Sequence, residues 1–327
     1  MSRRPLPPPL SLPKPGFGRR MPPAVFVPIM GVFGLGLGWR AAAGAYGVTP
    51  GIGDLLLGGV TLLYAFALVT WLAKPLRRAD VVLEELRVLP GRAGLAAGSL
   101  SLPLLAAALA PFAPGLAVVV LLLGLVVHLG LLAMLLRVMW RGPPEGRVVT
   151  PVFHLWFVGF IISGLAANAL GFYGTARALV WAMLVPAAVI YALSLRQLLS
   201  LVPPPPLRPL LAIHLAPACL LAQVAHGAGM GIAPMLGGVA GVIFVALLLG
   251  ARWMLASGFS PLWGALTFPL AAFATMLITL SDGQGALGIA GGVALALASP
   301  AILVIAWRIL RMWPDGKLAA RTNAAEA

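Results

Sequence analysis

The ionisable side chains that could perform catalysis or hold a metal are few, and their spacing suits neither task. His214 and His226, two of the four histidines, are twelve residues apart, which is too far for a metal pair on adjacent helical turns. The chain has no HExxH, CxxC or GxSxG motif, and its one cysteine, Cys219, lies in an apolar run. We therefore expect neither an enzyme nor a protein with a metal or another cofactor.

The composition shows which environment must hold these residues. Of 327 residues, 61% are hydrophobic and only 9% are charged, and the mean hydropathy is +1.02. Soluble domains carry about 25% charged residues. This deficit excludes a soluble enzyme and a disordered protein. It also excludes a nucleic-acid-binding protein, despite the net charge of +14.

Long apolar runs predict an all-α integral membrane protein with ten transmembrane helices, because a helix needs about 20 apolar residues to cross the hydrocarbon. We expect a Pro- and Arg-rich tail at 1–23, a membrane domain at 24–311 and a second tail at 312–327. The predicted spans lie at 24–44, 53–73, 94–111, 115–137, 151–171, 175–196, 209–227, 233–254, 261–281 and 286–310.

The connections between spans predict their pairing and orientation. Those after odd-numbered spans are short and rich in Gly and Pro, so consecutive spans should form five antiparallel hairpins. Of the 22 basic residues, all but Arg40 and Arg177 fall in the tails, in connections after even-numbered spans or at the adjoining ends of those spans. The positive-inside rule places that side, with both termini, in the cytoplasm.

No charged residue falls in the middle of a span. Carriers coupled to protons or sodium usually keep an ionisable group within the membrane. Its absence disfavours tight ion coupling and predicts weak anion binding, which permits fast passage. The eight acidic residues lie at span ends or outside spans: Asp54, Asp80, Glu84, Glu85, Glu145, Asp282, Asp315 and Glu326.

Prolines and glycines within spans have two possible meanings. Pro28, Pro103, Pro217 and Pro269 each lie in an odd-numbered span, which suggests kinked inner helices around a conduit. Alternatively, they reflect the general abundance of proline in transmembrane helices. The spacing of Gly34 and Gly38 indicates close helix packing and identifies no ligand.

Four segments resemble the tellurite-resistance/dicarboxylate transporter family, which includes bacterial TehA and the slow anion channels of plant guard cells. They are PPAVFVPIMG at 22–31, PVFHL at 151–155, LAPA at 215–218 and LWGALTFP at 262–269. The order and spacing of these segments carry the resemblance over most of the chain. Two residues depart from the family pattern: Val27 replaces a glycine beside the gate, and Trp156 replaces a proline.

The resemblance implies that odd-numbered helices line a central pore with quasi-fivefold symmetry and that even-numbered helices surround them. It implies a homotrimer in which each protomer has its own pore. It also implies that a phenylalanine, Phe268 by motif, plugs the pore. Phe268 precedes Pro269, which should bias its backbone away from a regular helix.

Position within the odd-numbered spans suggests further pore-lining residues. They are Phe26, Val27, Gly31, Pro103, Phe157, Pro217, Leu220 and Thr267.

Together these observations predict a gated channel or uniporter for small inorganic or organic anions in the lipid bilayer of a bacterial inner membrane. A carrier for C4-dicarboxylates or tellurite, coupled to protons or not, is the alternative that the family suggests. The third possible function is that of a membrane protein that transports nothing, such as a scaffold or a membrane enzyme.

Overall fold

The computed structural model describes residue 16 and residues 18–327, and within them the chain forms helices and no strand. Most of the predicted tail at 1–23 lies outside the described residues. Among the described residues, eight helical segments are long and apolar enough to cross a membrane, and two shorter apolar helices cover 154–169 and 233–249. These helices are consistent with an integral membrane protein, and the prediction of ten spans remains open at these two positions.

Burial divides the helices into an inner and an outer set. In the long inner segments 67% to 89% of the most apolar stretch is buried, against 17% to 33% in the long outer ones. The inner set comprises η1 (Pro23–Val25) with α1 (Phe26–Tyr46), α4 (Leu89–Leu109), η3 (His154–Val158) with α6 (Ile161–Ala169), η4 (Pro205–His214) with α8 (Leu215–Gly227), and η5 (Pro261–Leu266) with α11 (Thr267–Ser281).

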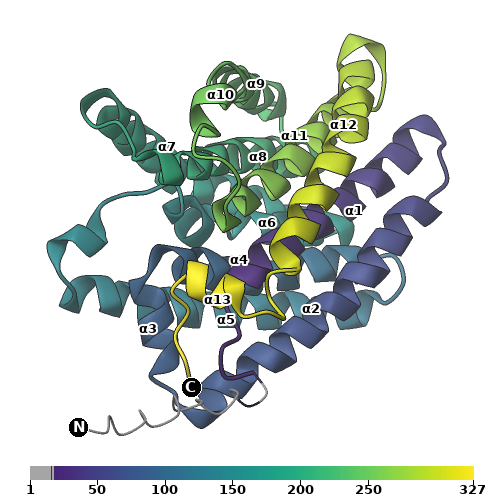
Figure 1. Ribbon diagram of the computed structural model, residues 1–327. Coiled ribbons are helices and arrows are strands. Elements are labelled where there is room, and N and C mark those ends of the chain that lie inside the picture. The colour runs from purple at the N-terminus through teal and green to yellow at the C-terminus, as the bar shows by residue number, and fades with distance from the viewer. Residues whose placement is uncertain (1–15, 17) are drawn as a thin grey trace, which may run out of the picture.

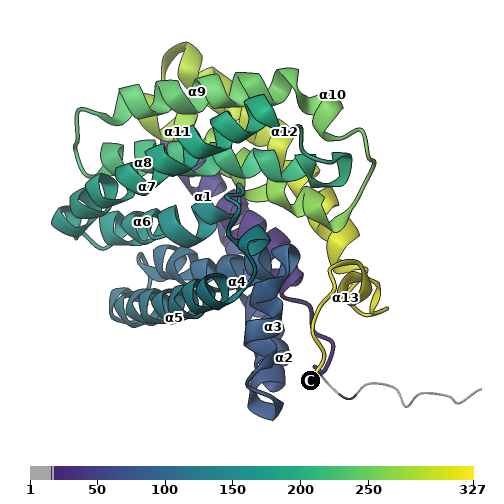
Figure 2. The ribbon, with the colours of Figure 1, turned by 90° about the vertical axis from the view of Figure 1, so that its left-hand side faces the viewer.

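The outer set exposes apolar side chains to the surroundings, as a lipid-facing layer must. It comprises α2 (Gly51–Arg77), α5 (Pro114–Arg141), α7 (Tyr173–Ser200), α9 (Ala233–Leu249) and α12 (Gly285–Leu310). Figure 1 shows α4 in the middle of the molecule, α1 running outward from the middle, and α2, α7 and α12 at the rim. In Figure 2, α5 and α9 lie at opposite sides, with α6 and α8 between them.

Four short helices complete the described chain: α3 (Val81–Arg87), η2 (Pro144–Arg147), α10 (Ala251–Met254) and α13 (Lys317–Arg321). The sequence predicted a connection at 74–93, whereas α2 continues to Arg77, α3 follows, and α4 begins at Leu89, five residues before the predicted span. A hydropathy average does not predict the last turn of α2, helix α3 or the first turn of α4, because charged residues lower the average there.

Most inner segments begin irregularly. A 3₁₀ turn precedes α1, α8 and α11, and a π-helical turn precedes α6. Pro28, Pro217 and Pro269 each occupy the third position of the α-helix that follows. Each of these three prolines therefore lies inside a continuous helical span, close to the point where the 3₁₀ turn gives way to α-helix. Pro103 lies inside α4. A kink of the helix axis at these prolines stays a prediction.

Candidate functional site

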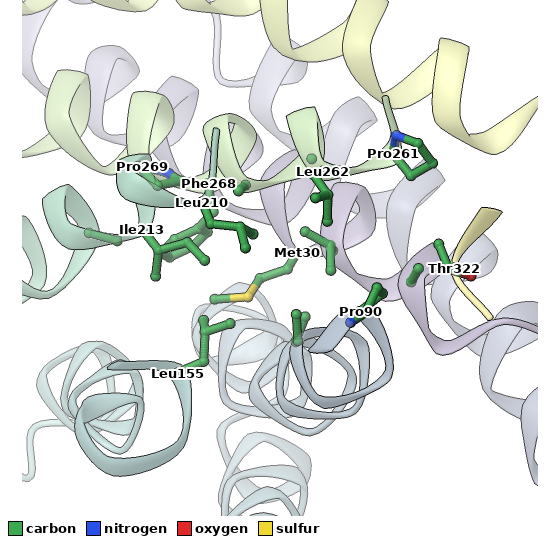
Figure 3. Close-up of a pocket in the computed structure, with 17 residues that line it drawn as sticks. Met30, Pro90, Leu155, Leu210, Ile213, Pro261, Leu262, Phe268, Pro269 and Thr322 are labelled. Carbon is green, nitrogen blue, oxygen red and sulfur yellow. The ribbon is translucent and has the colours of Figure 1, made fainter. Parts of the chain in front are cut away.

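Two small cavities follow one another along the inner helices, and together we call them the conduit. Met30, Leu155, Ile213, Ala216 and Phe268 line both. The first cavity continues to residues near the starts of the inner segments, such as Pro90 and Pro261, and the second to residues further along them, such as Leu100 and Leu220. The five shared residues therefore lie at the junction between the cavities. Figure 3 shows Leu155, Met30, Ile213 and Phe268 converging from different helices.

The conduit is narrow in this structure. Its two cavities have volumes of about 50 Å³ and about 20 Å³. A single water needs roughly 10–15 Å³ measured in this way, so the cavities admit a few waters at most. Their lining is apolar apart from Thr322 in the first cavity and His154 in the second. A narrow apolar passage resists hydration and therefore resists ions.

Phe268 is one of the five residues that line both cavities, and it is 7% exposed. Its ring lies against α1 at Gly34, where an added Cβ would come within 2.9 Å of ring atom Cδ2. Gly34 therefore makes room for the ring, a role beyond the helix packing that its spacing suggested. The expected departure of Phe268 from helical backbone is wrong: Phe268 is the second residue of α11, and the irregular turn lies just before it in η5.

The other predicted pore-lining residues fall into two groups. Val27 lines the first cavity, and Pro217 and Leu220 line the second. Gly31 and Thr267 lie where α1 and α11 approach each other, because a Cβ on Gly31 would collide with the Thr267 side chain. These two residues set the spacing of the helices that carry Val27 and Phe268, and they do not line the cavities.

Three further predicted residues do not line the two cavities either. Phe26 packs edge-on against Tyr64 of α2, with ring centroids 5.9 Å apart. Pro103 contacts α5, where a Cβ on Gly124 would come within 2.9 Å of its Cδ. Phe157 stays partly buried in the π-helical turn η3. A role for these three residues in an open pore stays a prediction.

Sequence reasoning missed four residues at the junction: Met30, Leu155, Ile213 and Ala216. All except Ile213 lie inside the segments that carry the family resemblance. The sequence held one signal for Ala216. Like Phe268, Ala216 directly precedes the proline in the first turn of its α-helix.

The histidines near the conduit form hydrogen bonds within the protein. His154 is 1% exposed, and its Nε2 lies 2.9 Å from Nδ1 of His214, whose carbonyl accepts a hydrogen bond from Tyr191. His128 pairs with the Ser99 hydroxyl at 2.8 Å. Within the described residues no three His, Cys, Asp or Glu side chains gather as a metal site would require.

Charged side chains flank the conduit and do not enter it. Near the C-terminal end of α1, Arg40 Nε pairs with Asp54 of α2 at 2.7 Å. At the opposite end of the inner helices, Lys74 Nζ lies 2.5 Å from Glu85, and neither side chain is exposed. Burial raises the pKa of the Glu85 carboxyl, and the Lys74 charge opposes that rise. The sequence placed both residues in the connection between the second and third predicted spans.

Comparison with known proteins settles the family. The model of the voltage-dependent anion channel family, SLAC1, matches residues 20–313. The chain belongs to this family. The match confirms the resemblance found in the sequence, and it covers the whole conduit except Thr322. Membership in the SLAC1 family indicates an anion channel or transporter in a membrane. No curated protein matches the chain.

Proposed function

We propose that the protein is a gated channel or uniporter through which small anions move down their gradient, with Phe268 as the plug of the pore. The observation that supports the proposal is that Phe268 lines both of the cavities that inner helices line together. If its ring separates the cavities, removing the ring should join them into one passage.

The electrostatics of the conduit support passage rather than tight binding. The lining of both cavities contains no carboxylate that would repel an anion and no Lys or Arg that would retain one. Weak interaction along the path lets an ion leave as readily as it enters. The basic surface at the predicted cytoplasmic side raises the local anion concentration, an effect that salt screens.

The wider arrangement is part of the same proposal. Ten spans in five hairpins would include the two shorter apolar helices, each extended by its flanking turns. Both termini would lie in the cytoplasm and the protein in the inner membrane, as the distribution of basic residues predicts. A homotrimer with one pore in each protomer rests on the family resemblance.

The test compares two phenylalanines of α11 in liposome anion-flux assays. Phe268→Ala should raise anion flux well above that of the unmodified protein, because it removes the ring between the cavities. Phe273→Ala is the matched control, since Phe273 is also 7% exposed but stacks on Phe244 of α9 at 3.9 Å. Phe273→Ala should leave flux near the unmodified level.

Equal flux through the two variants at matched reconstitution would show that Phe268 is not the plug. Saturable exchange that depends strictly on a proton gradient, without electrogenic anion current, would support a dicarboxylate or tellurite carrier instead.

A further inference from the structure

A second cavity system lies outside the conduit, with a volume of about 840 Å³. Arg87 of α3, Arg92 of α4, and Arg137 and Arg141 of α5 line it, and we call it the arginine cavity. Glu145 is the only acidic residue in its lining. Four guanidinium groups against one carboxylate leave a cavity with an excess of three positive charges.

Among the described residues Arg137 and Arg141 have no ionic partner, and Arg87 has only the nearby charge of Glu84. Arg87, Arg137 and Arg141 form no side-chain hydrogen bond or ion pair within the part of the chain that the structure describes. Arg137 and Arg141 are four residues apart on α5, so they lie on one face of the helix, and like charges at this spacing destabilise a helix. An anion between these side chains would remove that repulsion.

Arg92, the fourth arginine, and Arg147 fix the backbone segments around the cavity through hydrogen bonds to carbonyl groups. Arg92 is 8% exposed and donates hydrogen bonds to the carbonyls of Leu86 and Gly146, which joins α3 to the η2 turn. Arg147 donates to the carbonyls of Met139 and Trp140 at the end of α5. The wall therefore has a defined shape, and Arg87, Arg137 and Arg141 remain available for a ligand.

The surroundings indicate what kind of anion occupies the arginine cavity. It opens at the end of α5, an outer helix whose Leu129 and Leu136 are exposed and whose Trp140 is 84% exposed. Exposed tryptophan at a helix end is typical of the membrane interface. Apolar side chains beside a basic cavity offer one surface for acyl chains and another for a charged headgroup.

We propose that the arginine cavity binds the phosphate headgroup of an anionic phospholipid, with its acyl chains against the exposed apolar face of α5. Arginine suits this role because its planar donors match phosphate oxygens in pairs. Helix α4 separates this site from the conduit, since Pro90 and Ala93 line the first conduit cavity while Leu89 and Arg92 line the arginine cavity.

The test measures binding and does not depend on conduction. Delipidated protein in detergent is titrated with phosphatidylglycerol, phosphatidylcholine or inorganic phosphate, and thermal unfolding and native mass spectrometry report binding. Phosphatidylglycerol should raise the Tm of the unmodified protein and form adducts. The double variant Arg137→Gln/Arg141→Gln should lose most of that rise. Arg196→Gln, at the end of the outer helix α7 and outside the cavity, should retain it.

The Tm of each variant without lipid separates a binding defect from a folding defect, and we expect little change because Arg137 and Arg141 are exposed. An equal rise with phosphatidylcholine would overturn the proposal. An equal rise in Tm with inorganic phosphate would contradict the proposal that the ligand is a lipid. Loss of the rise in Arg196→Gln as well would refute the assignment to this cavity.

Discussion

The buried pair Lys74–Glu85 gives a sharp prediction about stability. Both side chains are fully buried, and Lys74 also donates to the carbonyl of Met21 at 3.0 Å. Glu85 accepts a second hydrogen bond from the backbone N–H of Ala325 at 3.1 Å. The pair therefore joins the end of α2 to α3 and to the C-terminal segment.

Glu85→Ala would leave the Lys74 amine buried with a single carbonyl partner. Removing one partner of a buried ion pair costs about 3–5 kcal/mol, because the remaining charge stays desolvated. For domains of 150–250 residues each kcal/mol lowers Tm by about 2–4 °C, so we expect a loss of roughly 6–20 °C. Thermal unfolding in detergent, followed by intrinsic fluorescence, measures it.

The matched control is the neighbouring residue. Glu84 pairs with Arg78 at the surface, where solvent screens the charges, so Glu84→Ala should lower Tm far less. Replacing both buried partners, as in Lys74→Met/Glu85→Leu, should recover much of the stability, because no buried charge remains. Equal Tm losses in Glu84→Ala and Glu85→Ala, or a double variant less stable than Glu85→Ala, would refute the reasoning.

Two further predictions concern contacts near the conduit. Gly34→Ala should lower Tm in the unmodified protein but much less in the Phe268→Ala background, because the added Cβ meets the Phe268 ring at 2.9 Å; additive losses in the double-mutant cycle would contradict this contact. Ser99→Ala should cost about 1–3 kcal/mol, because it leaves the buried His128 Nδ1 unpaired. In Ser101→Ala, where the lost bond goes only to the Ala97 carbonyl of the same helix, we expect a smaller drop in Tm, and equal drops would contradict the prediction.

Much of the helical layout was predictable from hydropathy, and the outer helices most clearly. The prediction of a span at 115–137 corresponds to α5 at Pro114–Arg141, because an outer helix is an unbroken apolar run. The inner segments were harder. The 3₁₀ turn η4 begins in a run of prolines at 203–206, and hydropathy cannot separate such a turn from an α-helix.

The candidate site was predictable from two sources, the family resemblance and position within odd-numbered spans. The resemblance indicated Phe268, and position indicated Val27 and Leu220; all three line the conduit. The orientation of Phe26 and Pro103 could not be predicted, since inner helices are apolar on every face and periodicity shows no preferred side. The contact between Gly34 and Phe268 lies between two helices that are far apart in sequence. The spacing of residues within one helix cannot predict such a contact.

The central claim is that Phe268 closes a path for anions, and the reversal potential of Phe268→Ala tests it most directly. In planar bilayers with unequal chloride concentrations, the account predicts a current that reverses near the chloride equilibrium potential. Chloride can then be replaced with nitrate, sulfate or malate to rank the permeant anions. A reversal potential near the cation equilibrium potential, or no current through the variant, would contradict the account.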